Sequence, residues 1–514
     1  MTYSRGQGES VFLGKLHRLL QHCLMPDKFT RCGSIVLALV FSIGYLLTAS
    51  KLEGYALSYF CNLLLILLAT ILMLRRLGPP SMVTAPLWLC LGYFLVSYCL
   101  KFFLILLLPA SPAEVGTVGP LCLPVEFKCQ NTYVHSLSPY DWTTIPAEAR
   151  AIALSAICIA GFCLAASIGT YSEFRVSLRQ TTRAEVAYAK VLLIFAACLS
   201  IATAIIFYQY NIGLMGSVVK IDLPYKFRGV VYFLRTICLP GMLYLSIYIS
   251  YRSKSFITMV AGLALLLGNG GLDVVFRSSR SALLYPLLGL FLLAFSAEVK
   301  IRLRTLMWSF VGMLPVFMSI PYVSSYRVNR IQLDAWDALV KSIIEMGYNP
   351  LIHIGKGLVF VIYRFTGVDV LASMLGHEAL PIGSFIFDVL RSERGVSGYL
   401  STSVFGTPAD YPGASAPGFV GWSYLVGGVP GVLFGGAFLA LTVWYVWGRL
   451  LKIDTPTIVV SRVFFLLIVF LIITDGTVDT LRKMFFVMLF TLVSLELGAR
   501  LMTGFMKLYE RRVS

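Results

Sequence analysis

Long apolar stretches recur from one end of this chain to the other. Each is close to the roughly 20 residues that a helix needs to cross the hydrocarbon core of a membrane. Unpaired backbone groups in lipid cost several kcal/mol each, so such stretches must be helical. The runs are continuous and lack the ten-residue alternation of a membrane β-barrel. The sequence therefore predicts an all-α polytopic membrane protein.

Composition agrees with this class, because 58% of the 514 residues are apolar and only 13% are charged. Soluble domains are less apolar and more charged. We predict about twelve transmembrane helices, with a range of about 11 to 14, because span boundaries read from sequence are uncertain. They form a single integral membrane domain over residues 1–514. The predicted spans are 32–50, 55–74, 84–108, 151–170, 191–209, 230–250, 257–272, 281–297, 306–323, 419–447, 463–474 and 484–499.

Basic residues concentrate in alternate short loops, as in LRRLG, SEFRVSLRQTTR, YRSKS and EVKIRLR. The positive-inside rule then places the N-terminus and the C-terminus in the cytoplasm. Much of the net charge of +17 is explained by this topology. It gives no reason to expect a nucleic-acid partner. Cys122 and Cys129 share one outside loop, which leaves a disulfide between them open.

The longest predicted segment outside the membrane covers residues 324–418, on the side opposite the cytoplasm. Its opening, IQLDAWDALVKSIIEM, places Ile331, Trp336, Val340 and Ile344 near one helical face. This pattern predicts an amphipathic helix at the membrane interface. The rest mixes apolar patches with Gly and Pro, as loops do. The apolar stretch 351–362 leaves a further membrane entry open.

Two arginines break the inside rule where an outside turn enters the eighth predicted span. Arg277 and Arg280 lie three residues apart in DVVFRSSRSALL, and Ser278 and Ser279 are candidate caps of the following helix. Free backbone N–H groups, the positive end of the helix dipole and two guanidinium groups would then meet. This arrangement suits a phosphate group.

Further arginines repeat this theme. Arg327 and Arg330 have the same spacing in SYRVNRIQL, Arg364 ends an apolar run in VIYRFTGVD, and Arg235 falls inside the sixth predicted span. Intramembrane charges are costly and are therefore functional candidates. The alternative for any single arginine is a side chain that reaches lipid headgroups. Several arginines that flank one large loop favour a shared anion.

The strings SSRSALL, YRFTGVDVLASMLG and APGFVGWSYLVGGVPGVLFGG resemble bacterial oligosaccharide repeat-unit polymerases of the Wzy type. The resemblance covers roughly the second half of the chain. It implies a glycosyltransferase of the bacterial inner membrane that acts at the periplasmic face and builds O-antigen of lipopolysaccharide or a related surface polysaccharide. Donor and acceptor would be oligosaccharides on a polyprenyl carrier such as undecaprenyl diphosphate. A chain-length regulator is a further candidate partner, and no cofactor is implied.

The implied reaction needs cations at the leaving diphosphate, where negative charge grows in the transition state. Arginine can donate two parallel hydrogen bonds to phosphate oxygens, and this binding does not need a metal. We therefore assign diphosphate binding to Arg277, Arg280, Arg327, Arg330 and Arg364. The attacking sugar hydroxyl benefits from a general base. Glu378 or His377 is the preferred base, and Asp369 would orient an arginine or a sugar hydroxyl. Other candidates are His353, Asp388 and Glu393.

Two rival functions stay open. An O-antigen ligase would use the same donor but lipid A–core as acceptor. A flippase or transporter of anionic lipid-linked glycans is the other rival, although such proteins often show internal repeats that are not evident here.

Overall fold

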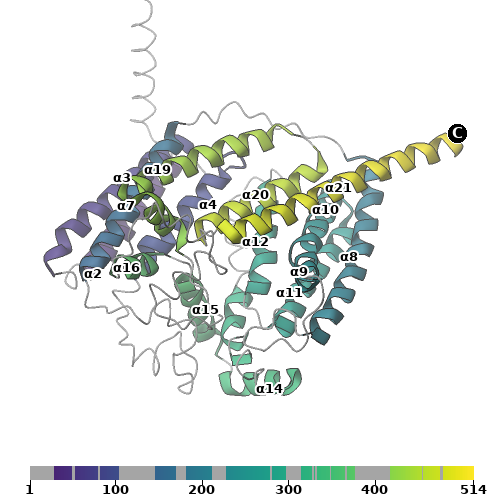
Figure 1. The fold of residues 1–514 in the computed structure, drawn as a ribbon, viewed down its shortest axis with the longest axis horizontal. Helices are drawn as coiled ribbons and strands as arrows, with labels where there is room; N and C mark the ends of the chain where they lie inside the picture. The colour runs from purple at the N-terminus through teal and green to yellow at the C-terminus, as the bar shows by residue number, and fades with distance from the viewer. Residues whose placement is uncertain are drawn as a thin grey trace, which may run out of the picture.

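The computed structural model describes residues 28–48, 53–78, 81–103, 145–168, 181–210, 227–277, 281–296, 314–323, 325–326, 329, 333–347, 349–364, 367–376, 417–453, 455–474 and 478–513. These residues form helices and connecting turns, with no strand among them (Figure 1). The prediction of an all-helical chain is confirmed for this part of the sequence.

Nine of the described helices are long and apolar enough to cross a membrane, by length and composition. They are α3 (Ala56–Leu77), α4 (Ala85–Phe94) with η3 (Leu95–Leu100), α7 (Ile145–Ile168), α8 (Arg183–Tyr210), α9 (Phe227–Phe233) with η5 (Leu234–Cys238) and α10 (Leu239–Arg252), α11 (Phe256–Arg277), α19 (Gly418–Leu451), α20 (Pro456–Thr474) and α21 (Val478–Val513). Shorter apolar helices lie over Gly33–Leu47, within α2 (Lys28–Thr48), and over Leu314–Val323, here called helix 314–323, and α12 (Ser281–Ser296) has 16 residues. The predicted total of about twelve spans is not confirmed.

The helices pack around two large apolar cores. One core joins α3, α4, η3, α7 and α19, and the other joins α8, α10, α11, α12, α21 and the end of α19 at Trp447 and Leu451. Helix α20 contributes to both, with Val469 and Ile473 in the first core and Val463 and Leu466 in the second. Helices α19 and α20 thus join the two groups of helices (Figure 1).

Glycine permits a close helix contact in the first core. A Cβ atom added to Gly161 of α7 would lie 2.7 Å from the carbonyl oxygen of Leu433 in α19, and one added to Gly436 would meet the carbonyl oxygen of Cys158. In lipid, helices associate through such close backbone packing, because the surrounding acyl chains are as apolar as the side chains. The GVPGVLFGG run therefore makes the α7–α19 interface.

Helix α19 is broken at Gly428, whose φ of 61° lies in the left-handed region. A Cβ atom on Gly435 would lie 2.6 Å from Ser423 Oγ. In a straight helix twelve residues separate two positions by about 18 Å. The chain therefore folds back at Gly428, and the predicted span 419–447 contains a helix reversal.

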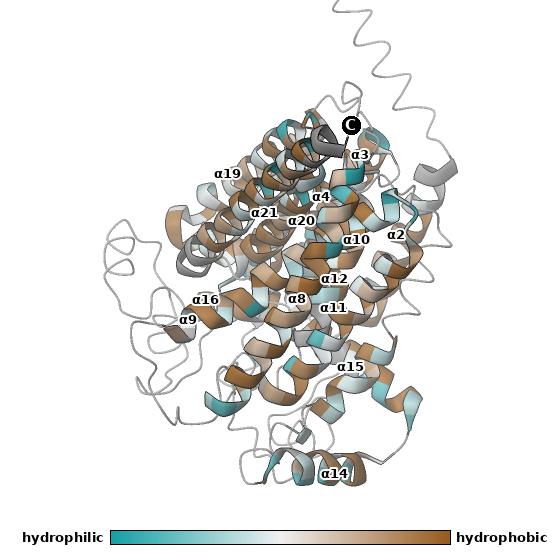
Figure 2. Cartoon of the chain, turned by 90° about the vertical axis from the view of Figure 1, so that its right-hand side faces the viewer, coloured by the Kyte–Doolittle hydropathy of each residue, from teal (hydrophilic) through white to brown (hydrophobic). Residues whose placement is uncertain are grey.

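Part of the predicted loop 324–418 packs into the bundle. Helix α16 (Val368–Gly376) buries Leu371 and Met374, and a Cβ atom on Gly367, just before it, would meet the carbonyl oxygen of Ser97 in η3. Helix α15 (Pro350–Arg364) contacts helix 314–323. Helix α14 (Ala335–Met346) lies at one end of the molecule in both Figure 1 and Figure 2.

Arg462 of α20 is buried and holds two helix ends. Its guanidinium donates to the carbonyl oxygens of Leu450, Leu451 and Ile453 at the end of α19, and of Ser296 at the end of α12. The last carbonyls of a helix have no partner within the helix, and a cation there also complements the helix dipole. Arg462 thus serves as a structural clamp.

Candidate functional site

Arg235 is a deeply buried cation among the described residues, with 1% of its surface exposed. It lies in η5, a short π-helical segment between α9 and α10. Such wide turns inside membrane helices often mark functional positions. The sequence singled out Arg235 as an intramembrane charge, and its burial is now confirmed.

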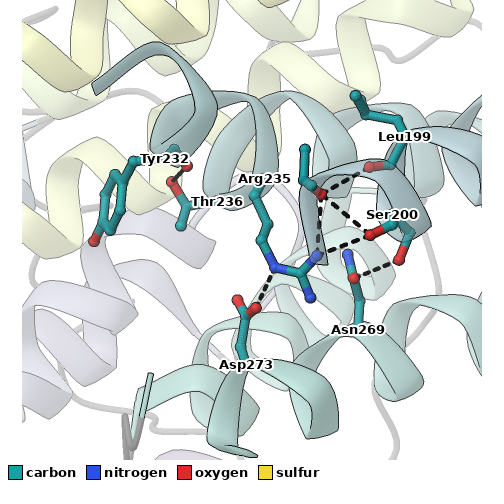
Figure 3. A network of polar contacts seen from close by, with 8 residues as sticks. Leu199, Ser200, Tyr232, Arg235, Thr236, Asn269 and Asp273 are labelled. Carbon is teal, nitrogen blue, oxygen red and sulfur yellow. Dashed lines mark hydrogen bonds and ion pairs between the residues drawn. The ribbon is translucent and has the colours of Figure 1, made fainter. Parts of the chain in front are cut away.

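The Arg235 side chain joins three membrane helices (Figure 3). Its Nε donates to Asp273 Oδ1 of α11, and its Nη1 donates to the carbonyl oxygen of Ser200 and to Thr203 Oγ1 of α8, both at 3.0 Å. Ser200 Oγ in turn donates to Asn269 Oδ1 of α11 at 2.6 Å. We call Arg235, Asp273, Ser200, Thr203 and Asn269 the Arg235 network.

One nitrogen of this arginine is left over. Nη2 is buried and has no hydrogen-bond partner among the described residues. The guanidinium carbon lies 5.4 Å from the centroid of the Phe207 ring, which supplies a weak cation–π contact. A buried guanidinium needs nearly all of its donors satisfied, and the two N–H groups of Nη2 are left for a further acceptor.

The Arg235 network lies close to the end of α11. Asp273 precedes Arg277 by four residues, which is about 6 Å along a helix. Tyr326 Oη donates to the carbonyl oxygen of Val275 at 2.9 Å. This bond joins the two segments that lead directly into the predicted arginine pairs, since Val275 precedes Arg277 and Tyr326 precedes Arg327.

A second polar cluster holds the chain beyond helix 314–323 to α14. Asn329 Nδ2 donates to Glu345 Oε2 at 2.8 Å and to Ser342 Oγ at 3.1 Å. Ser325 Oγ donates to Glu345 Oε2 at 2.9 Å, and Lys341 Nζ lies 3.7 Å from Glu345 Oε1. We call Ser325, Asn329, Lys341, Ser342 and Glu345 the Glu345 cluster. Asn329, which separates Arg327 from Arg330 in the sequence, is thereby fixed in place.

The Glu345 carboxyl is held in its charged form. The hydrogen bond from Asn329 lowers its pKa from the usual range, partial burial opposes this shift, and Ser325 and Lys341 add to the lowering. A carboxylate so stabilised is a poor proton acceptor but a well-oriented anion. The sequence analysis did not identify Glu345. The pattern that could have identified it is the spacing of Ser342 and Glu345, which lie three residues apart on the side of α14 opposite its apolar face.

His353, one of the predicted imidazoles, is buried in a structural position. Its ring lies 4.9 Å from the Tyr322 ring, centroid to centroid, and its Nε2 lies 3.3 Å from the carbonyl oxygen of Gly347. Tyr322 Oη donates to the same carbonyl at 2.7 Å. These contacts fasten the start of α15 to helix 314–323.

Helices α15 and 314–323 run antiparallel, because His353 meets Tyr322 while Gly357 meets Phe317. Arg364 ends α15 about 16 Å along the helix from His353. Helix 314–323 leads to Tyr326 in the opposite direction. This packing separates the backbone of Arg364 from the segment at Tyr326.

The remaining predicted site residues fall largely outside the described part of the chain. Arg277, Arg364 and Asp369 have a described backbone, in α11, α15 and α16, but their side chains lie outside what the structure describes. The whole of each of the following also lies outside it: Arg280, Arg327, Arg330, His377, Glu378, Asp388, Glu393, Cys122 and Cys129.

No group of three or more His, Cys, Asp or Glu side chains that could hold a metal ion occurs among the described residues. The described cysteines, including Cys90, Cys158 and Cys238, are free thiols. Comparison of the chain with family models, with curated proteins and with solved structures found no match.

Proposed function

We propose that this chain is a membrane glycosyltransferase that polymerises oligosaccharide repeat units carried on a polyprenyl diphosphate, for O-antigen or a related surface polysaccharide. The observation that carries the proposal is the hydrogen bond from Tyr326 to Val275. It brings the segments that lead into Arg277 and Arg327 together at the end of a membrane-spanning helix. Four arginines of two similar motifs would then surround one spot at the membrane boundary, where a lipid diphosphate lies.

The reaction follows from this placement. The acceptor hydroxyl oxygen attacks the anomeric carbon of the donor, the bond from that carbon to the diphosphate oxygen breaks, and the hydroxyl proton passes to a base. Arg277, Arg280, Arg327 and Arg330 stabilise the charge that grows on the diphosphate. Glu378 or His377 is the proposed base, and Asp369 the proposed orienting carboxylate. Arg364, at the far end of α15, is assigned to a more distant part of the donor.

The proposal is tested by reconstituting the purified protein in liposomes with purified lipid-linked repeat units. A ladder of products that differ by one repeat unit is expected. Transfer of glycan to lipid A–core without elongation would identify the ligase instead. Absence of both products, with a folded protein and intact substrate, would overturn the proposed activity.

The proposed setting is the bacterial inner membrane, with both termini in the cytoplasm and the arginines on the periplasmic side. Reporter fusions at residues 180 and 400 test this orientation independently of activity. The first should report the cytoplasm and the second the periplasm. A cytoplasmic signal at residue 400 would remove the periplasmic site.

One observation favours transport as a second candidate function. Helix α19 reverses at Gly428, and α16 is a short buried helix packed on α7 and on the first part of α19. Discontinuous helices of this kind often line the substrate sites of transporters. Liposomes that contain the lipid-linked glycan would separate the two functions. A flippase would move the glycan between the leaflets without forming a longer product.

A further inference from the structure

Helix α14 turns its apolar face away from the rest of the protein. Trp336, Ile343 and Ile344 are 71%, 53% and 74% exposed. At 100° per residue, these three side chains share one side of the helix with Val340 and Leu339. Figure 2 shows the apolar colouring on α14 at the lower end of the molecule.

The opposite side of α14 packs on the protein through small and polar groups. Ala338 and Ser342 are 0% and 1% exposed. Ser342 and Glu345 accept hydrogen bonds from Asn329, so the polar side is the one that contacts the protein. A third side carries Asp337 and Lys341, which are exposed. A helix packed on a water-soluble protein normally shows the reverse arrangement, with its apolar stripe toward the core.

The place of α14 in the fold indicates what covers its apolar face. Tyr326, between Ser325 and Asn329 of the Glu345 cluster, is bonded to the last turns of the spanning helix α11, and Tyr322 is bonded to Gly347 at the end of α14. Helix α14 thus lies at the level where a membrane-spanning helix ends. Leu351 and Ile352, in the first turn of α15, are apolar and exposed as well.

We propose that α14 and the first turn of α15 are a lipid-binding surface, with Trp336, Ile343, Ile344 and Leu351 seated among the acyl chains just below the headgroups. Asp337 and Lys341 then face the headgroups and water. The same helix fixes Asn329, so Asn329 is held at the depth of lipid phosphates. The lipid contact holds whether or not the chain is a glycosyltransferase.

Quenching of tryptophan fluorescence by brominated lipids tests this inference in the intact protein. The full chain is reconstituted in bilayers that carry bromine near the carbonyl end or near the methyl end of the acyl chain. The difference between wild type and Trp336→Phe isolates the emission of Trp336. We expect this emission to be quenched at least twofold more by bromine near the carbonyl end.

Two matched variants in the Trp336→Phe background test which side of α14 faces the lipid. Ile344→Trp places the probe on the apolar side of α14 and should show the same strong quenching. Lys341→Trp places the tryptophan on the side of α14 that faces water, and its emission should show little quenching. Both positions are exposed, so neither substitution disturbs the core.

The outcomes separate the possible occupants. If neither Trp336 nor the Ile344→Trp probe is quenched by either lipid, the face lies in water or is covered by protein, and the inference is wrong. Equal quenching of the Ile344→Trp and Lys341→Trp probes would contradict the proposed orientation. Loss of the polymer ladder alone leaves the quenching pattern unchanged, so failure of the proposed function is recognised separately.

Discussion

Arg235 Nε and Asp273 Oδ1 form an ion pair between η5 and α11 inside the membrane-spanning helices. The arginine side chain is fully buried and the aspartate nearly so, at 0% and 12% exposed. Removing one partner leaves the other charge buried without compensation. The pair therefore fixes the last turns of α11, which ends at Arg277.

We predict that Arg235→Met or Asp273→Leu alone lowers the free energy of unfolding by about 3–5 kcal/mol. The double variant should lose clearly less than the sum, because it removes both charges together. Reversible unfolding in mixed micelles of mild and denaturing detergent measures these differences. Additive losses would mean that the two charges do not interact.

Gly161→Ala should destabilise the α7–α19 interface. The new methyl group would lie 2.7 Å from the Leu433 carbonyl oxygen, so the two helices must move apart. Overpacking of this kind costs about 1–3 kcal/mol. Gly92→Ala in α4 is the matched control, since no atom lies within 4 Å of the position of its Cβ. The control should be neutral or slightly stabilising, and equal losses for both variants would refute the packing argument.

Glu345→Gln should reduce stability at neutral pH and have little effect in acid. The folded state lowers the pKa of the Glu345 carboxyl. Its contribution is therefore present above the ordinary carboxyl pKa and is lost as the pH falls toward the lowered folded pKa. Because Glu345 is exposed, we expect less than about 1 kcal/mol. Melting of both proteins between pH 7 and about pH 3 measures this, and a gap independent of pH would exclude the carboxylate as its source.

Arg280→Lys should impair polymerisation although it keeps the charge, because lysine lacks the bidentate fork that grips a phosphate. Polymer amount and length on a gel are the readout, with Lys254→Arg in the turn between α10 and α11 as a charge-neutral control. Normal polymer from Arg280→Ala would exclude Arg280 as a diphosphate ligand.

Variants of Arg327 and of the candidate bases should fail in different ways. Removal of Arg327 should weaken both donor binding and turnover, since its charge attracts the bound diphosphate. Removal of Glu378 or His377 should leave binding almost intact and lower turnover by about 10²- to 10⁴-fold. Binding of lipid diphosphate to the purified variants, measured together with polymer yield, distinguishes diphosphate ligands from bases. Wild-type rates in both base variants would place the base elsewhere.

The sequence by itself determined the class of the protein and the position of most helices. Apolar stretches of span length leave the backbone no alternative to helix in lipid, so 281–297 was recognised and appears as α12 (Ser281–Ser296). It also marked Arg235, because a charge inside an apolar run is conspicuous. The predicted diphosphate ligands and bases remain predictions, since their side chains lie outside the described residues.

Tertiary structure decided which residues meet. Asp273 as the partner of Arg235, Glu345 as an anchor for Asn329, and the reversal at Gly428 all depend on contacts between segments that are distant in sequence. Hydropathy measures only how apolar a window is and carries no information on such pairings. It identified α14 as amphipathic, but only the packing of Ser342 against Asn329 showed that the polar side faces the protein and the apolar side faces outward.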